Sequence, residues 1–151
     1  SARALFGDET ADYDAALARY YRQGPPPDWS LGYISAYAAA HPGEDWAEPW
    51  AHYLHMVDTL ETARDMGFSL DGRLMALPQA ALQETQHASH PPAAPRGFTA
   101  LQRDWVQLSV TMNALNRSMG LPDAYPFVLT DKVAAKLGYV HELIAAHMGG
   151  R

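Results

Sequence analysis

The sequence predicts an all-α fold, an irregular bundle of about five helices that forms a single helical domain over residues 1–151. Apolar residues recur at steps of three and four in every long segment, which is the period of a helix with one buried face. Runs of alternating β-branched residues, which indicate strands, are missing. Of the 151 residues 48% are hydrophobic, so the chain is long enough and apolar enough to bury a core.

Three helices are expected in the N-terminal half. The first, over residues 12–23, ends at Gly24 and a run of three prolines, which cannot continue a helix. The second, over 30–40, ends at a His-Pro-Gly break. The third, over 44–66, is the longest and is closed by Gly67, since glycine is the preferred residue after a helix C-terminus.

The C-terminal half begins with a loop-rich insertion over 67–98, in which a short helix is expected over 78–87. A longer helix is predicted over 99–119, and Thr130 is a plausible N-cap for the last one. Both helices carry an apolar seam at steps of three and four, which predicts their buried faces. The seam residues are Leu101, Trp105, Leu108, Met112, Leu115 and Met119 in the first, and Val133, Leu137, Val140 and Ile144 in the second.

Composition excludes several classes of function. The net charge is −6 and no basic cluster occurs, which argues against nucleic acid as a partner because phosphate binding needs clustered Lys and Arg. The chain has no cysteine, so it has no thiolate metal site. No run of about 18 apolar residues predicts a membrane span. No secretory signal pattern is present either, and a cytoplasmic location is expected.

The third helix has two contrasting faces when residues are placed 100° apart. The apolar side is expected to face the core and holds Trp46, Trp50, Tyr53, Val57 and Leu60. The opposite side holds Glu44, Glu48, His52, His55 and Asp58. Such a stripe is often only a solvated polar face, but carboxylate and imidazole are also ligands that zinc takes. Pro49 lies inside the helix, where it removes a backbone hydrogen bond and is expected to bend it.

Residues 44–54, Glu-Asp-Trp-Ala-Glu-Pro-Trp-Ala-His-Tyr-Leu, resemble the glutamate helix of gluzincins, the metallopeptidases with an H-E-x-x-H helix and a downstream zinc-binding glutamate. A second long match covers 113–128, and shorter ones include Leu5 to Glu9, Asp12-Tyr13 and residues 55–62. Together these segments resemble the bacterial family of putative zinc-binding metallopeptidases. The resemblance implies that the chain is the C-terminal helical subdomain of such an enzyme.

The resemblance implies roles for three residues. Glu44 would be the third zinc ligand, and Glu48 would orient a zinc-bound histidine or a nearby backbone amide. Tyr37 precedes Glu44 by seven residues, as does a tyrosine that stabilises the oxyanion in lethal-factor-type gluzincins. Tyr37 is also well explained by packing in the core. The implied cofactor is zinc, and the implied substrate is a peptide or protein.

The H-E-x-x-H segment of the family is absent from the chain. The pair His141-Glu142 does not replace it, because Ala145 stands where the second histidine is required. We therefore expect the chain to be a fragment whose missing N-terminal part carries that motif. Alone, it should bind zinc weakly or not at all, lack peptidase activity and self-associate through a surface around Tyr33, Tyr37 and residues 44–55. The alternative is a non-catalytic helical protein-interaction module.

Overall fold

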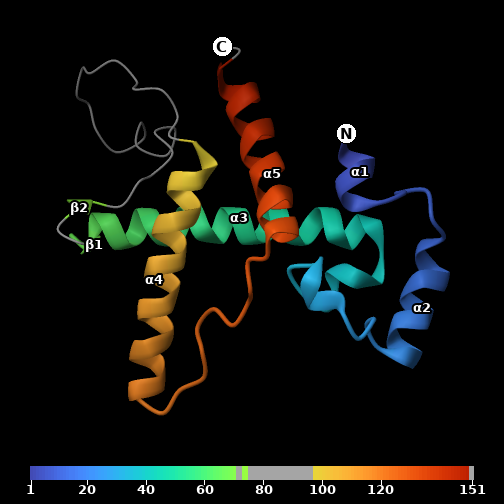
Figure 1. The fold of residues 1–151 in the computed structure, drawn as a ribbon, viewed down its shortest axis with the longest axis horizontal. Coiled ribbons are helices and arrows are strands. Elements are labelled where there is room, and N and C mark those ends of the chain that lie inside the picture. The colour runs from blue at the N-terminus through green and yellow to red at the C-terminus, as the bar shows by residue number, and fades with distance from the viewer. Residues whose placement is uncertain (71–72, 75–96, 150–151) are drawn as a thin grey trace. The chain divides into compact units, whose positions relative to one another are not determined.

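The computed structural model describes residues 1–70, 73–74 and 97–149 (Figure 1). The all-α prediction is confirmed. The α-helices of the described part are α1 (Ala2–Phe6), α2 (Tyr13–Gln23), α3 (Pro42–Asp65), α4 (Phe98–Ser118) and α5 (Asp131–Gly149). Two 3₁₀ turns, η1 (Trp29–Leu31) and η2 (Ala38–Ala40), lie between α2 and α3. Two strands of two residues each, β1 (Ser69–Leu70) and β2 (Arg73–Leu74), form an antiparallel pair that the sequence did not predict.

Local signals explain where several helices begin and end. The Asp12 side chain accepts the backbone N–H of Ala15 at 3.0 Å and caps α2. Gly24 ends that helix at a φ of 76°, a conformation that favours glycine. The expected N-cap of the last helix is confirmed, because the Thr130 hydroxyl accepts the N–H of Val133 at 3.3 Å.

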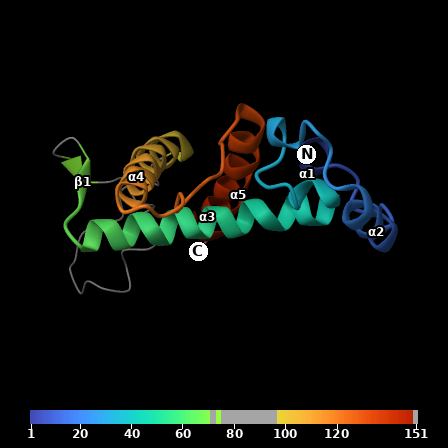
Figure 2. The ribbon, with the colours of Figure 1, turned by 90° about the horizontal axis from the view of Figure 1, so that it is seen from below.

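The chain divides into two compact units. Unit 1 consists of Ser1–Tyr53 and Phe127–Val140, and unit 2 consists of Leu54–Pro126 and His141–Arg151. The boundaries fall inside α3 and α5, so each of these helices contributes residues to both units. Figures 1 and 2 show the helical ribbon of α3, and Pro49 lies inside this helix.

Unit 1 is built around aromatic rings and a small aliphatic core. The Phe6 ring of α1 meets Trp46 of α3 edge to face, with centroids 5.0 Å apart, and Tyr139 of α5 at 6.0 Å. Such edge-to-face pairs add to the free energy gained by burying the rings. The α5 seam is confirmed in this unit, since Val133, Leu137 and Val140 are fully buried.

A buried ion pair joins α3 to α5 within unit 1. The Nζ atom of Lys136 donates to both carboxylate oxygens of Asp45, at 2.7 and 2.6 Å, and to the carbonyl of Gly32 at 2.7 Å. It also lies 4.5 Å from the centre of the Tyr33 ring. All three ammonium hydrogens can therefore be used, which is what a buried charge requires.

In unit 2, side chains of α4 form hydrogen bonds with the segment that follows this helix. The Asn113 amide donates to the carbonyl of Tyr125 at 2.8 Å and accepts its N–H at 2.9 Å. Arg117 makes two parallel hydrogen bonds to Asp123, at 2.6 and 2.5 Å. The Tyr125 ring then packs against buried Trp105, with centroids 4.8 Å apart.

Two details of the sequence-based predictions were wrong, and a third is not tested. The expected helix over 30–40 is instead an irregular segment between η1 and η2. The α4 seam ends early, because Leu115 and Met119 are 55% and 66% exposed. The short helix expected over 78–87 and most of the expected insertion over 67–98 lie outside the described residues.

The predicted polar face of α3 was wrong at one residue. His55 and Asp58 are exposed as predicted, and Ala47 and Ala51 are exposed as well. His52 is buried, and so is Asp45, which was not assigned to either face. The reason is that α3 is covered on more than one side in unit 1. Phe127 meets His52 edge to face at 4.5 Å, and α5 supplies Lys136 for Asp45.

Candidate functional site

Glu44 lies in the first turn of α3 and is half-buried. Its Oε1 atom accepts a hydrogen bond from the Tyr13 hydroxyl at the start of α2. Residues 31 positions apart therefore meet at this carboxylate. A carboxylate held by a second side chain has a fixed orientation, as ligands of metal ions commonly do.

Tyr37 belongs to the same group of side chains. The neighbouring Tyr13 hydroxyl, burial and the nearby Glu44 charge raise the pKa of Tyr37. The pKa of Tyr13 is raised in turn, chiefly by its hydrogen bond to Glu44. The Tyr13 hydroxyl thus lies beside both Tyr37 and the Glu44 carboxylate. Both phenols stay protonated at neutral pH and can act as hydrogen-bond donors.

Glu48 lies one turn further along α3 and contacts a different partner. Its Oε2 atom accepts the Ser35 hydroxyl at 2.8 Å, and Ser35 Oγ in turn accepts the backbone N–H of Ala38 at 3.0 Å. His52 Nε2 lies 3.8 Å from the same carboxylate oxygen. Glu48 therefore fixes the backbone on both sides of Tyr37, because residues 35 and 38 flank it.

His41 supports the entrance to α3. The Gly43 N–H donates to His41 Nδ1 at 2.8 Å, so this nitrogen carries no proton. The neutral ring then has its proton on Nε2, which lies 3.0 Å from the carbonyl of Ala11 and donates to it. The ring also meets Tyr13 edge to face at 5.0 Å. His41 thus connects the backbone just before the start of α2 with the start of α3, beside Glu44.

Among residues 1–70, 73–74 and 97–149, no group of three or more His, Cys, Asp or Glu is arranged to hold a metal ion. A catalytic zinc site needs three protein ligands and an open position. Glu44 has the right chemistry for one of them, but the described residues do not by themselves make a zinc site. His141 is buried beside Phe98, and burial lowers its pKa.

The structure brings two of the three sequence-predicted site residues, Tyr37 and Glu44, together beside Tyr13, and it places Glu48 one turn away. Sequence reasoning missed Tyr13 and Ser35. The signal for Tyr13 was present, since Asp12-Tyr13 was one of the short family-like matches. Ser35 had no comparable signal, because its role depends on a contact with α3 across 13 positions. In the part of the chain that the structure describes, no helix is long and apolar enough to cross a membrane.

Comparison with known proteins bears on this site. The chain is 41% identical over 140 residues to uncharacterized proteins of Mycobacterium bovis and Mycobacterium tuberculosis. The match takes in 93% of the chain but only 37% of the length of these relatives. No solved structure matches. A family model described as putative zinc-binding metallo-peptidase matches residues 1–143, and the chain therefore belongs to this family.

Proposed function

We propose that the chain is the C-terminal helical part of a zinc-dependent metallopeptidase and that Glu44 is one of its zinc ligands. The remaining ligands would be the two histidines of an H-E-x-x-H segment elsewhere in the whole protein. The observation that carries the proposal is the Glu44 carboxylate, held by Tyr13, which also lies beside Tyr37. Family membership is the second support.

Zinc, when bound, would lower the pKa of a water molecule and polarise the scissile carbonyl of a peptide. The residues of this chain act around that centre. Tyr13 orients the Glu44 carboxylate by donating to one of its oxygens. Such partners of a ligand typically change metal affinity by about 10–100-fold when they are removed.

Tyr37 is the proposed donor to the negative charge that develops on the substrate oxygen. A phenol with a raised pKa keeps its proton at neutral pH and can offer it as a hydrogen bond. In the absence of substrate the Tyr37 hydroxyl lies beside Tyr13, so a substrate oxygen would compete with Tyr13 for it. Glu48 is a positioning residue, because it holds Ser35 and thereby the backbone that carries Tyr37.

Zinc content tests the ligand assignment directly. We expect the complete protein to retain stoichiometric zinc after dialysis, measured by plasma mass spectrometry, and Glu44→Gln to lose most of it. Glu61→Gln on the same helix is the matched control and should retain it. Hydrolysis of fluorescein-labelled casein should follow the same pattern.

Two results would overturn the proposal. If Glu44→Gln kept its zinc, the ligand assignment would be wrong. If the complete protein bound no zinc and cleaved no peptide, the helical interaction module would become the better account. Self-association of the chain around Tyr33, Tyr37 and residues 44–55 also remains a prediction, and analytical ultracentrifugation at several concentrations tests it.

A further inference from the structure

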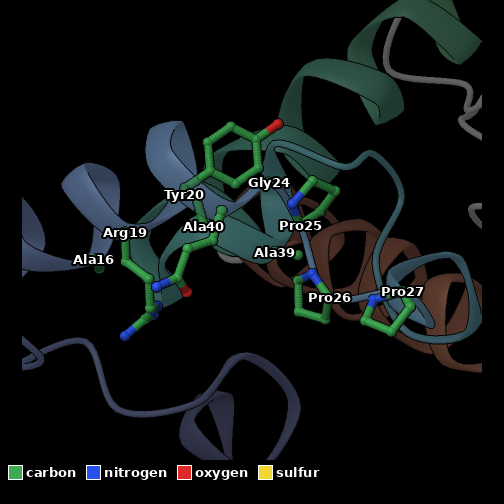
Figure 3. A pocket seen from close by; sticks show the side chains of 10 residues that line it. Ala16, Arg19, Tyr20, Gly24, Pro25, Pro26, Pro27, Ala39 and Ala40 are labelled. Atoms are coloured by element: carbon green, nitrogen blue, oxygen red, sulfur yellow. The ribbon is translucent and has the colours of Figure 1, made fainter.

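Unit 1 contains a hollow of about 290 Å³ between α2, the three-proline segment and η2 (Figure 3). This volume lies close to the lower limit for small-ligand sites, about 300 Å³, and suits one or two amino-acid residues. Pro26 and Pro27 form one side, while Tyr20 and Arg19 lie across from them. Of the described residues, those that line the hollow are Ala16, Arg19, Tyr20, Gln23, Gly24, Pro25, Pro26, Pro27, Ala39 and Ala40.

The walls of the hollow are held in place before any ligand arrives. Proline rings fix their own backbone angle φ, so the three-proline segment has little freedom to lose on binding. Ala16 and Ala40 are buried, and α2 packs against η2. The Gly24 N–H donates to the Tyr20 carbonyl at 2.7 Å, which sets the direction in which the proline segment leaves α2.

Among the residues that the structure describes, the hollow has a single charged group in its lining. Apart from the phenol of Tyr20, Arg19 is the only ionisable residue of that described lining, although the whole chain has 17 acidic and 11 basic residues. Arg19 is exposed, and within the described residues no hydrogen bond or ion pair of its guanidinium is found. Gln23, one turn after Arg19 on α2, adds an amide donor to the same wall. The apolar walls and planar cation together suit a carboxylate attached to a short apolar stem.

The hollow adjoins the candidate site through one of its own walls. The Tyr20 ring meets the Tyr37 ring edge to face, with centroids 5.8 Å apart. Ala39 and Ala40 follow Tyr37 directly in the chain. A ligand seated against Tyr20 and η2 would therefore lie next to the group that contains Tyr37, Tyr13 and Glu44.

We propose that this hollow binds a peptide residue that carries a carboxylate, with Arg19 as its charge partner. That the ligand is a peptide rests on the proposed function. The carboxylate has two possible sources in a peptide, an acidic side chain or the free C-terminus. Both would place a negative charge against the guanidinium and an apolar stem against Tyr20 and the prolines.

Peptide binding to the ¹⁵N-labelled chain tests the proposal by NMR without zinc or cleavage. The probes are acetyl-Ala-Ala-Glu-Ala amide, acetyl-Ala-Ala-Ala with a free C-terminus, and acetyl-Ala-Ala-Gln-Ala amide. We expect one or both carboxylate peptides to shift the amide signals of Tyr20, Ala39 and Ala40, and the neutral peptide to bind more weakly. Comparison of the first two probes distinguishes the side-chain carboxylate from the terminal one.

Arg19→Gln should weaken binding of the preferred carboxylate peptide by about fivefold, the upper end for an exposed ion pair. Arg22→Gln is the matched control, since Arg22 lies on the same helix but does not line the hollow, and it should bind as wild type. Equal binding of the neutral peptide, equal loss in both variants, or no binding at all would overturn the proposal. Because no metal takes part, a positive result would stand even if Glu44 proved not to bind zinc.

Discussion

Replacing Lys136 with methionine should leave the Asp45 carboxylate buried without its partner. Asp45 is 1% exposed and Lys136 5%, and the ammonium group donates to Asp45 and to the Gly32 carbonyl. Methionine keeps most of the length and apolar stem of lysine, so the substitution removes the charge and its three hydrogen bonds with little change in packing.

Removal of one partner from a buried ion pair typically costs about 3–5 kcal/mol in the free energy of unfolding. A domain of this kind has about 5–15 kcal/mol in total, so the loss would be a large fraction of it. Replacing both partners, as Asp45→Leu with Lys136→Met, should recover most of the loss, because no uncompensated charge remains. The Gly32 carbonyl would still lack its donor in the double variant, which accounts for a residual cost of about 1–3 kcal/mol.

The dependence on pH has a definite sign. Burial raises the pKa of Asp45 from 3.8 to about 6, while the hydrogen bonds and charge of Lys136 oppose this rise. The pKa of Asp45 is higher in the folded than in the unfolded state. Its contribution to the free energy of unfolding is therefore present below about pH 4 and is lost as pH rises through about 6. Without Lys136 the pKa of Asp45 should rise further. The destabilisation by Lys136→Met should therefore be smaller at pH 5 than at pH 8.

Urea unfolding followed by circular dichroism at both pH values measures these effects. Lys132→Met, an exposed lysine one turn earlier on α5, is the control and should change the free energy of unfolding by less than about 0.5 kcal/mol. A loss below about 1 kcal/mol for Lys136→Met at pH 8 would refute the reasoning. So would strictly additive effects of Asp45→Leu and Lys136→Met, since coupled partners must deviate from additivity.

Three further outcomes are expected. Tyr13→Phe should weaken zinc binding by the complete protein by about 10–100-fold, because Glu44 loses its hydrogen-bond donor. A chelator competition measures the affinity, and the circular dichroism spectrum should stay unchanged. Unchanged zinc affinity would count against the role of Tyr13. Asn113→Ala should lower the free energy of unfolding by about 1–3 kcal/mol, since both backbone groups of Tyr125 lose their partner; a loss below 0.5 kcal/mol, roughly the error of urea titration, would contradict this. Gly24→Ala should cost about 1–3 kcal/mol by thermal unfolding, because a φ of 76° with a ψ of −177° is a conformation that essentially only glycine adopts; an unchanged melting temperature would show that the turn relaxes freely.

The sequence predicted the long helices well because their signals are local. Asp12 and Thr130 are N-caps that act within three residues, and Gly24 acts on its own backbone. The expected helix over 30–40 failed because Ser35 bonds Glu48 of α3, a contact that overrides the helix propensity of the alanines.

The prediction of which polar residues of α3 are exposed failed for a similar reason. The partner of Asp45 is Lys136, and the ring against His52 is Phe127, both far along the chain. A helical wheel places residues on faces but does not say how many faces are covered. Within the candidate site, Tyr37 and Glu44 came from the family-like spacing. Their position beside Tyr13 required the packing of α2 against the start of α3.

The Asp45–Lys136 bond also has a consequence for synthesis of the protein. The two residues are separated by 91 positions, and unit 1 takes its residues from two segments that flank Leu54–Pro126 of unit 2. At translation rates of about 5–20 residues per second, roughly 5–18 s pass between the synthesis of one partner and the other. Throughout that interval α3 can form as a helix, but Asp45 must remain hydrated, because burying it alone is costly. Unit 1 therefore cannot complete its fold while its first segment emerges from the ribosome. The last step of its folding, in which Asp45 is buried against Lys136, requires that α5 has been synthesised.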